Sequence, residues 1–177
     1  MNFKIKKGKG VRGEITIPGD KSISHRSIMC ASLAEGPSTI YGFLEGDDCL
    51  ATMNAFKSMG INFEISEDEI LVHGLGLRGL KKPSNDINLG NSGTSVRLLS
   101  GILAAQDFSS TLIGDESLSS RPMNRIIEPL SMMGAKIKSN NSGNLPLKIN
   151  KSDLLQAIKY ELPIASAQIK SCILFAG

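Results

Sequence analysis

The sequence is poor in aromatic residues and in cysteine. Among 177 residues it has no tryptophan, two tyrosines and six phenylalanines, and none of these interleaves with a basic run. We therefore expect no platform for stacking nucleic-acid bases, because such platforms combine aromatic faces with cations. Cys30, Cys49 and Cys172 lie far apart in helical patterns. They are expected to be reduced thiols in the core rather than disulfides or zinc ligands.

Long apolar runs and metal-ligand spacings are also missing. No stretch is apolar for long enough to cross a membrane, and no basic and apolar leader precedes the first strand pattern. We therefore expect a cytoplasmic protein without membrane contact and without a metal. The net charge of +3 is a mild excess that could serve nucleic acid or small anions. Because no aromatic residues interleave with a basic run, we expect small anions as binding partners.

Two segments 71 residues apart have nearly the same pattern. Residues 19–26 (GDKSISHR) and 90–97 (GNSGTSVR) each follow a short apolar run and open a helical pattern. A weaker third copy, residues 162–170 (LPIASAQIK), places Ser22, Gly93 and Ser166 at equivalent positions. A small, hydroxyl-rich turn before a helix leaves free N–H groups at the positive end of the helix dipole. Each turn is therefore a candidate anion-binding site.

Basic residues stand close to the start of each of these helices. Lys21 and Arg26 follow the first turn, Arg97 the second and Lys170 the third. The positive end of a helix dipole disfavours cations, so we interpret them as groups that bind a phosphate or carboxylate. Three such turns brought together would form a site for an anionic substrate.

The repeat extends beyond the turns. Residues 38–42 (STIYG) match 110–114 (STLIG), and 58–61 (SMGI) match 132–135 (MMGA). The pattern predicts an α/β (α+β) fold built from repeated βαβαββ units. The expected helices are 22–34, 48–59, 92–106 and 121–133; the expected strands are 15–18, 38–43, 61–65, 69–73, 86–89, 109–114, 135–138 and 145–149.

These units divide the chain near residues 85 and 157. The first would span 15–85 and the second 86–157, and a third would begin at 158 and stop inside its first helix. A helix as apolar as residues 169–175 needs partner strands to cover it. We therefore expect the chain to be truncated relative to a complete protein.

Three more residues are candidates for binding. Gly93 has no Cβ, so a ligand could approach its backbone closely. Arg121 is predicted at a helix N-cap with Pro122 at the first helical position. Because arginine is not a favoured cap, a carboxylate or phosphate partner would explain it, although a surface arginine fits the pattern equally well. His25 could donate to a substrate, but a structural role is more common for a single histidine on a helix.

Four motifs resemble the 5-enolpyruvylshikimate-3-phosphate synthase family. They are residues 18–26 (PGDKSISHR), 89–94 (LGNSGT), 121–123 (RPM) and 166–170 (SAQIK), in the order and spacing of that family. The resemblance covers essentially the whole chain, as the N-terminal part of a longer enzyme. It implies an inside-out barrel of two domains, each with three βαβαββ units, and an active site between them. Residues 15–177 would form the N-terminal substrate-binding domain, and residues 1–14 a strand region of the other domain.

The resemblance implies the activity of a 3-phosphoshikimate 1-carboxyvinyltransferase. Such an enzyme transfers the enolpyruvyl group of phosphoenolpyruvate to the 5-hydroxyl of shikimate-3-phosphate and releases phosphate, in the shikimate pathway to aromatic amino acids. It is the target of glyphosate. No metal or organic cofactor is implied. The expected partners are the two substrates and the remainder of the chain, and the complete enzyme is expected to be a monomer.

The same resemblance assigns roles to individual residues. Those expected to hold shikimate-3-phosphate are Ser22, Arg26, Ser166 and Gln168, with Ala167 between the last two. The residues expected to contact phosphoenolpyruvate are Lys21, Gly93 and Arg121. Asn91 and Thr94 are expected to shape the turn within residues 90–97. Lys21 is the candidate catalytic residue. The general acid and base are expected in the missing half, so the isolated chain should be inactive.

Other functions stay open. A related transferase acting on UDP-N-acetylglucosamine would carry Lys-Asn at Lys21-Ser22 and a reactive cysteine in residues 114–120, which have none. A non-catalytic anion-binding module or an RNA-end-processing relative could share the repeats. Sensitivity to glyphosate is also open, since SAQIK resembles a less sensitive subgroup whereas Gly93 is the residue of sensitive members.

Overall fold

The computed structural model describes residues 3–8 and 10–177. Residues 1, 2 and 9, which belong to the predicted strand region 1–14, lie outside the described residues. The first unit contains α1 (Lys21–Leu33), β1 (Glu35–Tyr41), α2 (Asp47–Ser58), β2 (Asn62–Ile65) and β3 (Glu69–Leu75). The second contains β4 (Ile87–Asn88), α3 (Gly93–Ala104), β5 (Ser110–Ile113), α4 (Glu116–Ser119), α5 (Asn124–Met132), β6 (Lys136–Lys138) and β7 (Leu147–Asn150), and α6 (Ala167–Ala176) follows.

The two units have equivalent sheets, which confirms the predicted repeat. In the first sheet the strand order is β1-β3-β2, and both pairings are antiparallel. In the second sheet β5, β7 and β6 are arranged in the same way, and β4 adds a parallel strand at the edge beside β5. The second unit is therefore a complete βαβαββ unit. The first lacks its opening strand.

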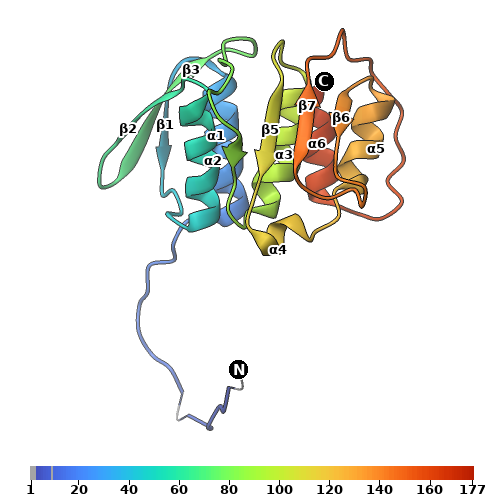
Figure 1. The fold of residues 1–177 in the computed structure, drawn as a ribbon. Helices are drawn as coiled ribbons and strands as arrows, with labels where there is room; N and C mark the ends of the chain where they lie inside the picture. The colour runs from blue at the N-terminus through green and yellow to red at the C-terminus, as the bar shows by residue number, and fades with distance from the viewer. Residues whose placement is uncertain (1–2, 9) are drawn as a thin grey trace.

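The strand predicted at residues 15–18 is not formed. Residues 3–8 and 10–20 contain no helix or strand, so the strand region predicted at 1–14 is not formed in its described residues either. The side chains of Ile15 and Ile17 are 78% and 72% exposed. Residues 10–20 lead away from the body of the molecule in Figure 1. A strand needs a neighbour to accept and donate its hydrogen bonds. In the second unit the equivalent strand, β4, has that neighbour in β5.

The prediction of one helix over residues 121–133 was also wrong about where that helix starts. Helix α4 forms earlier, because the carboxylate of Asp115 accepts from the backbone N–H of Leu118 at 2.7 Å and caps it. Pro122 disfavours helical backbone at Arg121, and α5 begins only at Asn124, after an N-cap at Met123. Arg121 is therefore not a helix N-cap. It lies in the turn between α4 and α5.

The cysteines follow the prediction in part. Cys49 and Cys172 are buried, and burial raises the pKa of the Cys172 thiol to about 12. Cys30 is exposed. It lies on α1 away from the face that is buried, which contains Ile28, Met29 and Ser32, so the prediction of a core position was wrong for this residue.

Three helices, α1, α3 and α6, begin at the same end of the molecule (Figure 1). Helices α3 and α6 pack closely, since a Cβ on Gly101 would overlap the carbonyl oxygen of Cys172. Glycine at this position therefore allows the two helix backbones to touch. This packing places the turn before α6 next to the turn before α3. Of the helices in the described part of the chain, none has the length and hydropathy needed to cross a membrane.

Candidate anion-binding site at three helix N-termini

A side chain caps each of the three helices. The Asp20 carboxylate accepts from Ile23 N at 2.7 Å in α1. The Ser92 hydroxyl accepts from Ser95 N at 3.3 Å in α3, and the Ser166 hydroxyl accepts from Ile169 N at 3.4 Å in α6. The three predicted turns therefore do precede helices. Each helix presents the positive end of its dipole at the same end of the molecule.

Two guanidinium groups flank Gly93. A Cβ on this glycine would lie 2.8 Å from Arg97 Nη1 and 3.1 Å from Arg121 Nη1. Desolvation is the largest cause that lowers the pKa of Arg97, and the charges of Arg121 and Arg125 lower it further. Neither Arg97 nor Arg121 pairs with a carboxylate within the described residues. Cations gathered in this way at a helix N-terminus form a site prepared for an anion.

Gln168 is held between two residues of α3. Arg97 Nη1 donates to its Oε1 at 3.1 Å, and its Nε2 donates to Thr94 Oγ1 at 3.1 Å. A guanidinium can only donate, so Arg97 fixes the amide oxygen on its own side. Gln168 consequently keeps its second amide hydrogen available to an acceptor.

Arg121 is held by a relay to Asp115. Its Nη2 donates to Asn91 Oδ1, and Asn91 Nδ2 donates to Asp115 Oδ2 at 2.7 Å. The other oxygen of Asp115 caps α4. The carboxylate therefore orients the arginine through an amide without neutralising it by direct contact.

The turn before α1 forms a separate group. The ammonium of Lys21 pairs with the carboxylate of Asp48, which lies in the first turn of α2. Ser22 and Arg26 are exposed, and their side chains make no hydrogen bond or ion pair within the part of the chain that the structure describes. They are free to bind a ligand.

The structure brings some of the predicted residues together. Around α3 and the start of α6 it gathers Asn91, Gly93, Thr94, Arg121 and Gln168, with Ser166 and Ala167 at the N-cap and first position of α6. It places Lys21, Ser22 and Arg26 at the start of α1 without direct contact to that group. The sequence prediction missed Asp48 and Asp115, and it gave Arg97 no specific ligand. Acidic residues at helix starts were the available signal for the first two.

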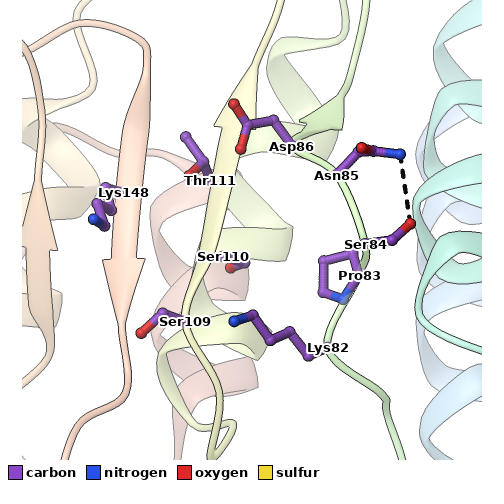
Figure 2. Close-up of a pocket in the computed structure, with 9 residues that line it drawn as sticks. All are labelled: Lys82, Pro83, Ser84, Asn85, Asp86, Ser109, Ser110, Thr111 and Lys148. Carbon is purple, nitrogen blue, oxygen red and sulfur yellow. Dashed lines mark hydrogen bonds between the residues drawn. The ribbon is translucent and has the colours of Figure 1, made fainter.

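A groove of about 280 Å³ lies elsewhere, beside β5 and β7. Figure 2 shows the ammonium of Lys82 directed toward the start of β5, where Ser109 and Ser110 lie, with Lys148 on the neighbouring strand. None of the predicted site residues lines this groove. The candidate site is therefore defined by its charges and helix ends rather than by the size of a cavity.

Comparison with protein families gives one match, which covers nearly the whole chain. The model of "EPSP synthase (3-phosphoshikimate 1-carboxyvinyltransferase)" matches residues 5–177. Curated proteins named 3-phosphoshikimate 1-carboxyvinyltransferase are similar to the chain. That of Ruthia magnifica is 58% identical over 175 residues, and that of Hydrogenovibrio crunogenus is 54% identical over 178 residues. The alignments cover 99% and 100% of this chain but 40% of each relative.

Solved structures give the same result. EPSP synthase from Acinetobacter baumannii is 53% identical, with a TM-score of 0.90 over 93% of this chain and 38% of that chain. The chain thus spans about 40% of the length of the curated relatives that it matches.

Proposed function

Because the chain belongs to the EPSP synthase family, we propose that it supplies the substrate-binding part of a 3-phosphoshikimate 1-carboxyvinyltransferase. The reaction would transfer the enolpyruvyl group of phosphoenolpyruvate to the 5-hydroxyl of shikimate-3-phosphate and release phosphate, on the route to aromatic amino acids. The observation that carries this proposal is the pair of guanidinium groups, Arg97 and Arg121, that flank Gly93 without a carboxylate partner among the described residues.

Phosphoenolpyruvate would bind at the start of α3. It carries a phosphate and a carboxylate, and both are ligands for guanidinium groups and for the N–H groups of a helix N-terminus. Gly93 leaves space for the anion because it has no Cβ, and Arg121 would donate to it. Asn91 would keep Arg121 in place, and Thr94 would orient Gln168.

Shikimate-3-phosphate would bind across the starts of α1 and α6. Ser22 and Arg26 have no competing partner within the described residues, and Arg26 would take the 3-phosphate. Ser166 and Gln168 would donate to the ligand from the start of α6. Ala167 lies between them and offers the first backbone N–H of that helix.

Lys21 would act at the reacting phosphoenolpyruvate. Its ammonium pairs with Asp48 in the structure and is 53% exposed, so it would exchange this carboxylate for a phosphate or carboxylate oxygen of the substrate. A cation placed there stabilises the negative charge of the tetrahedral intermediate and of the leaving phosphate. Lys21 is the catalytic residue that we assign to this chain.

The rest of the active site would come from a second domain. We assign residues 15–177 to the N-terminal domain and residues 1–14 to the other one, which would supply the general acid and base. The partners would be the two substrates and that domain, with no nucleic acid, no membrane and no cofactor, in a cytoplasmic monomer. The 177 residues alone would bind substrate without turnover.

The test is titration calorimetry of the chain with shikimate-3-phosphate and with shikimate. We expect the phosphorylated ligand to bind more tightly, and Arg26→Ala to lower its affinity about tenfold or more, because a charge-assisted hydrogen bond is lost. The control is Arg78→Ala, which removes an equal charge near the opposite end of α3, where Arg78 donates to Ala105 O.

Equal affinity for shikimate and shikimate-3-phosphate would contradict the proposal. Tight binding of oligonucleotides that weakens steeply with salt would instead favour the RNA-end-processing alternative. Preference for UDP-N-acetylglucosamine over shikimate-3-phosphate would favour the related transferase.

A further inference from the structure

A chain of buried hydrogen bonds runs through the interior behind the candidate site. His25 Nδ1 lies 2.7 Å from Thr52 Oγ1, and Thr52 Oγ1 lies 2.7 Å from Ser95 Oγ. Ser95 Oγ lies 2.6 Å from Ser92 Oγ. All four residues have no exposed surface. The chain therefore joins α1, α2 and α3 by polar contacts that water cannot replace.

Both ends of this chain lie next to the candidate site. His25 directly precedes Arg26 on α1, and Ser92 is the N-cap of α3 and directly precedes Gly93. Asp48 lies beside the middle of the chain, and its carboxylate pairs with Lys21. Its carbonyl oxygen is a second acceptor for the Thr52 and Ser95 hydroxyls, at 3.4 Å and 3.3 Å. Each hydroxyl has one hydrogen to donate, and the contacts of 2.7 Å and 2.6 Å within the chain are the shorter ones. The chain thus connects the two turns to which we assign different substrates.

The position of the proton on His25 decides whether Nδ1 donates to Thr52 or accepts from it. Its Nε2 is buried and has no hydrogen-bond partner among the described residues. A protonated ring would leave a charged N–H unpaired at Nε2, and the Nε2–H tautomer would leave a neutral N–H unpaired. The Nδ1–H tautomer leaves only a lone pair there. Unpaired buried N–H groups are rarer than unsatisfied acceptors, so the Nδ1–H tautomer is favoured.

We propose that His25 is a positioning residue, which as a neutral Nδ1–H tautomer donates to Thr52 and directs the chain from Thr52 to Ser95 to Ser92. Ser92 Oγ then accepts from the Ser95 hydroxyl and from Ser95 N, which is the acceptor role that an N-cap needs. His25 consequently fixes the start of α3 relative to the start of α1 without touching a ligand.

The consequence for binding rests on the proposed function. Shikimate-3-phosphate at α1 and phosphoenolpyruvate at α3 must be held at reacting distance, and small errors in such a distance are costly. Loss of one bond from this chain of hydrogen bonds should therefore lower the affinity for both ligands, or the cooperativity between their binding. All residues that touch a ligand remain present in such a variant.

The first test reads the tautomer directly in the unmodified chain without ligand. Two-bond hydrogen–nitrogen correlations in an NMR spectrum distinguish a protonated from an unprotonated ring nitrogen. We expect His25 to show a protonated Nδ1 and an unprotonated Nε2. A protonated Nε2 would overturn the proposal. With Nδ1 unprotonated, Nδ1 would accept from Thr52 instead of donating to it, and with Nδ1 also protonated the ring would be charged rather than neutral.

The second test interrupts the chain of hydrogen bonds at Thr52, in its centre. Thr52→Val removes the hydroxyl and keeps the volume, and we expect the backbone N–H groups of Ser95 and Val96 to exchange with solvent about five- to tenfold faster. The matched control is Ser100→Ala, since the buried Ser100 hydroxyl donates to Val96 O within its own helix at 2.7 Å. Equal effects of the two substitutions would overturn the proposal.

Rescue at His25 separates a donor from a space-filling ring. Asparagine can place an N–H near the position of Nδ1, whereas leucine cannot, so we expect His25→Asn to keep slow exchange at Ser95 and His25→Leu to lose it. If both variants behave alike, His25 does not act as a donor. These measurements use no ligand, so they stand even if the proposed substrates fail to bind.

Discussion

Arg97 Nη1 donates to Gln168 Oε1 at 3.1 Å and so joins α3 to α6 across 71 residues of sequence. The same guanidinium lies against Gly93, at the position that we assign to an anion. One arginine therefore orients an amide of the third turn and contributes charge to the second. This contact explains how turns from different repeats could act as one site.

Removal of the Arg97 charge should weaken binding without unfolding the chain. In Arg97→Gln, the amide of Gln168 is no longer oriented by a group that can only donate. We expect the affinity for shikimate-3-phosphate to fall about tenfold, the usual effect of losing a hydrogen bond to a charged group. Calorimetry measures this, with Arg78→Ala as the control. An unchanged affinity would show that the orientation of Gln168 does not matter.

Gly93→Ala should affect the anion at the start of α3. The added methyl group would lie 2.8 Å from Arg97 Nη1 and 3.1 Å from Arg121 Nη1, so both flexible side chains must move. We expect little change in thermal stability but weaker binding of phosphoenolpyruvate. In the complete enzyme we expect a greater loss for the bulkier inhibitor glyphosate. The ratio of the inhibition constant to KM measures this difference, and a ratio that does not rise would place Gly93 outside the pocket.

Lys21→Met should separate stability from function. The pair with Asp48 is partly exposed, and pairs of this kind contribute about 1 kcal/mol or less to folding. Thermal unfolding should therefore change little, while the affinity for phosphoenolpyruvate should fall about tenfold or more as a charged contact is lost. A large loss of stability with unchanged affinity would make Lys21 a structural residue.

The stability of the chain should depend on His25 at mildly acidic pH. Burial lowers the pKa of His25 below its ordinary value of 6.5, and the charges of Lys21 and Arg26 add to this against the opposite effect of Asp48. Below that ordinary value the unfolded chain binds a proton that the folded chain does not, so the free energy of unfolding falls as the pH falls. Urea unfolding between about pH 5 and pH 8 measures this slope.

His25→Asn is the control for this pH dependence, since asparagine does not titrate. We expect a smaller slope in this variant. Identical slopes in the two proteins would show that other groups, and not His25, cause the loss of stability.

The sequence predicted the elements that depend on local pattern. The glycine- and serine-rich segments 19–26 and 90–97 were correctly predicted to lead from a turn into a helix, and the βαβαββ order of the second unit was correct. These features follow from capping and from hydrophobic period, which act over a few residues. The site residues themselves were named by resemblance, and their roles remain predictions.

The features that sequence reasoning missed depend on contacts between distant elements. Ile15 and Ile17 have the pattern of a strand, but no strand formed without a neighbour. Asp48 and Asp115 looked like ordinary acidic residues of helix starts, yet they hold Lys21 and Asn91. The chain of hydrogen bonds from His25 to Ser92 involves three helices, and no local sequence pattern predicts it.

The place where shikimate-3-phosphate binds decides whether the starts of α1 and α6 form its site. Backbone amide shifts of the 177-residue chain can be followed by NMR as shikimate-3-phosphate is added. The proposed site predicts saturable shifts at residues 21–26 and 166–170, at the starts of α1 and α6, and at Arg97, which contacts Gln168. Shifts confined to the groove of Lys82, Ser110 and Lys148, or the absence of any saturable shift, would contradict it.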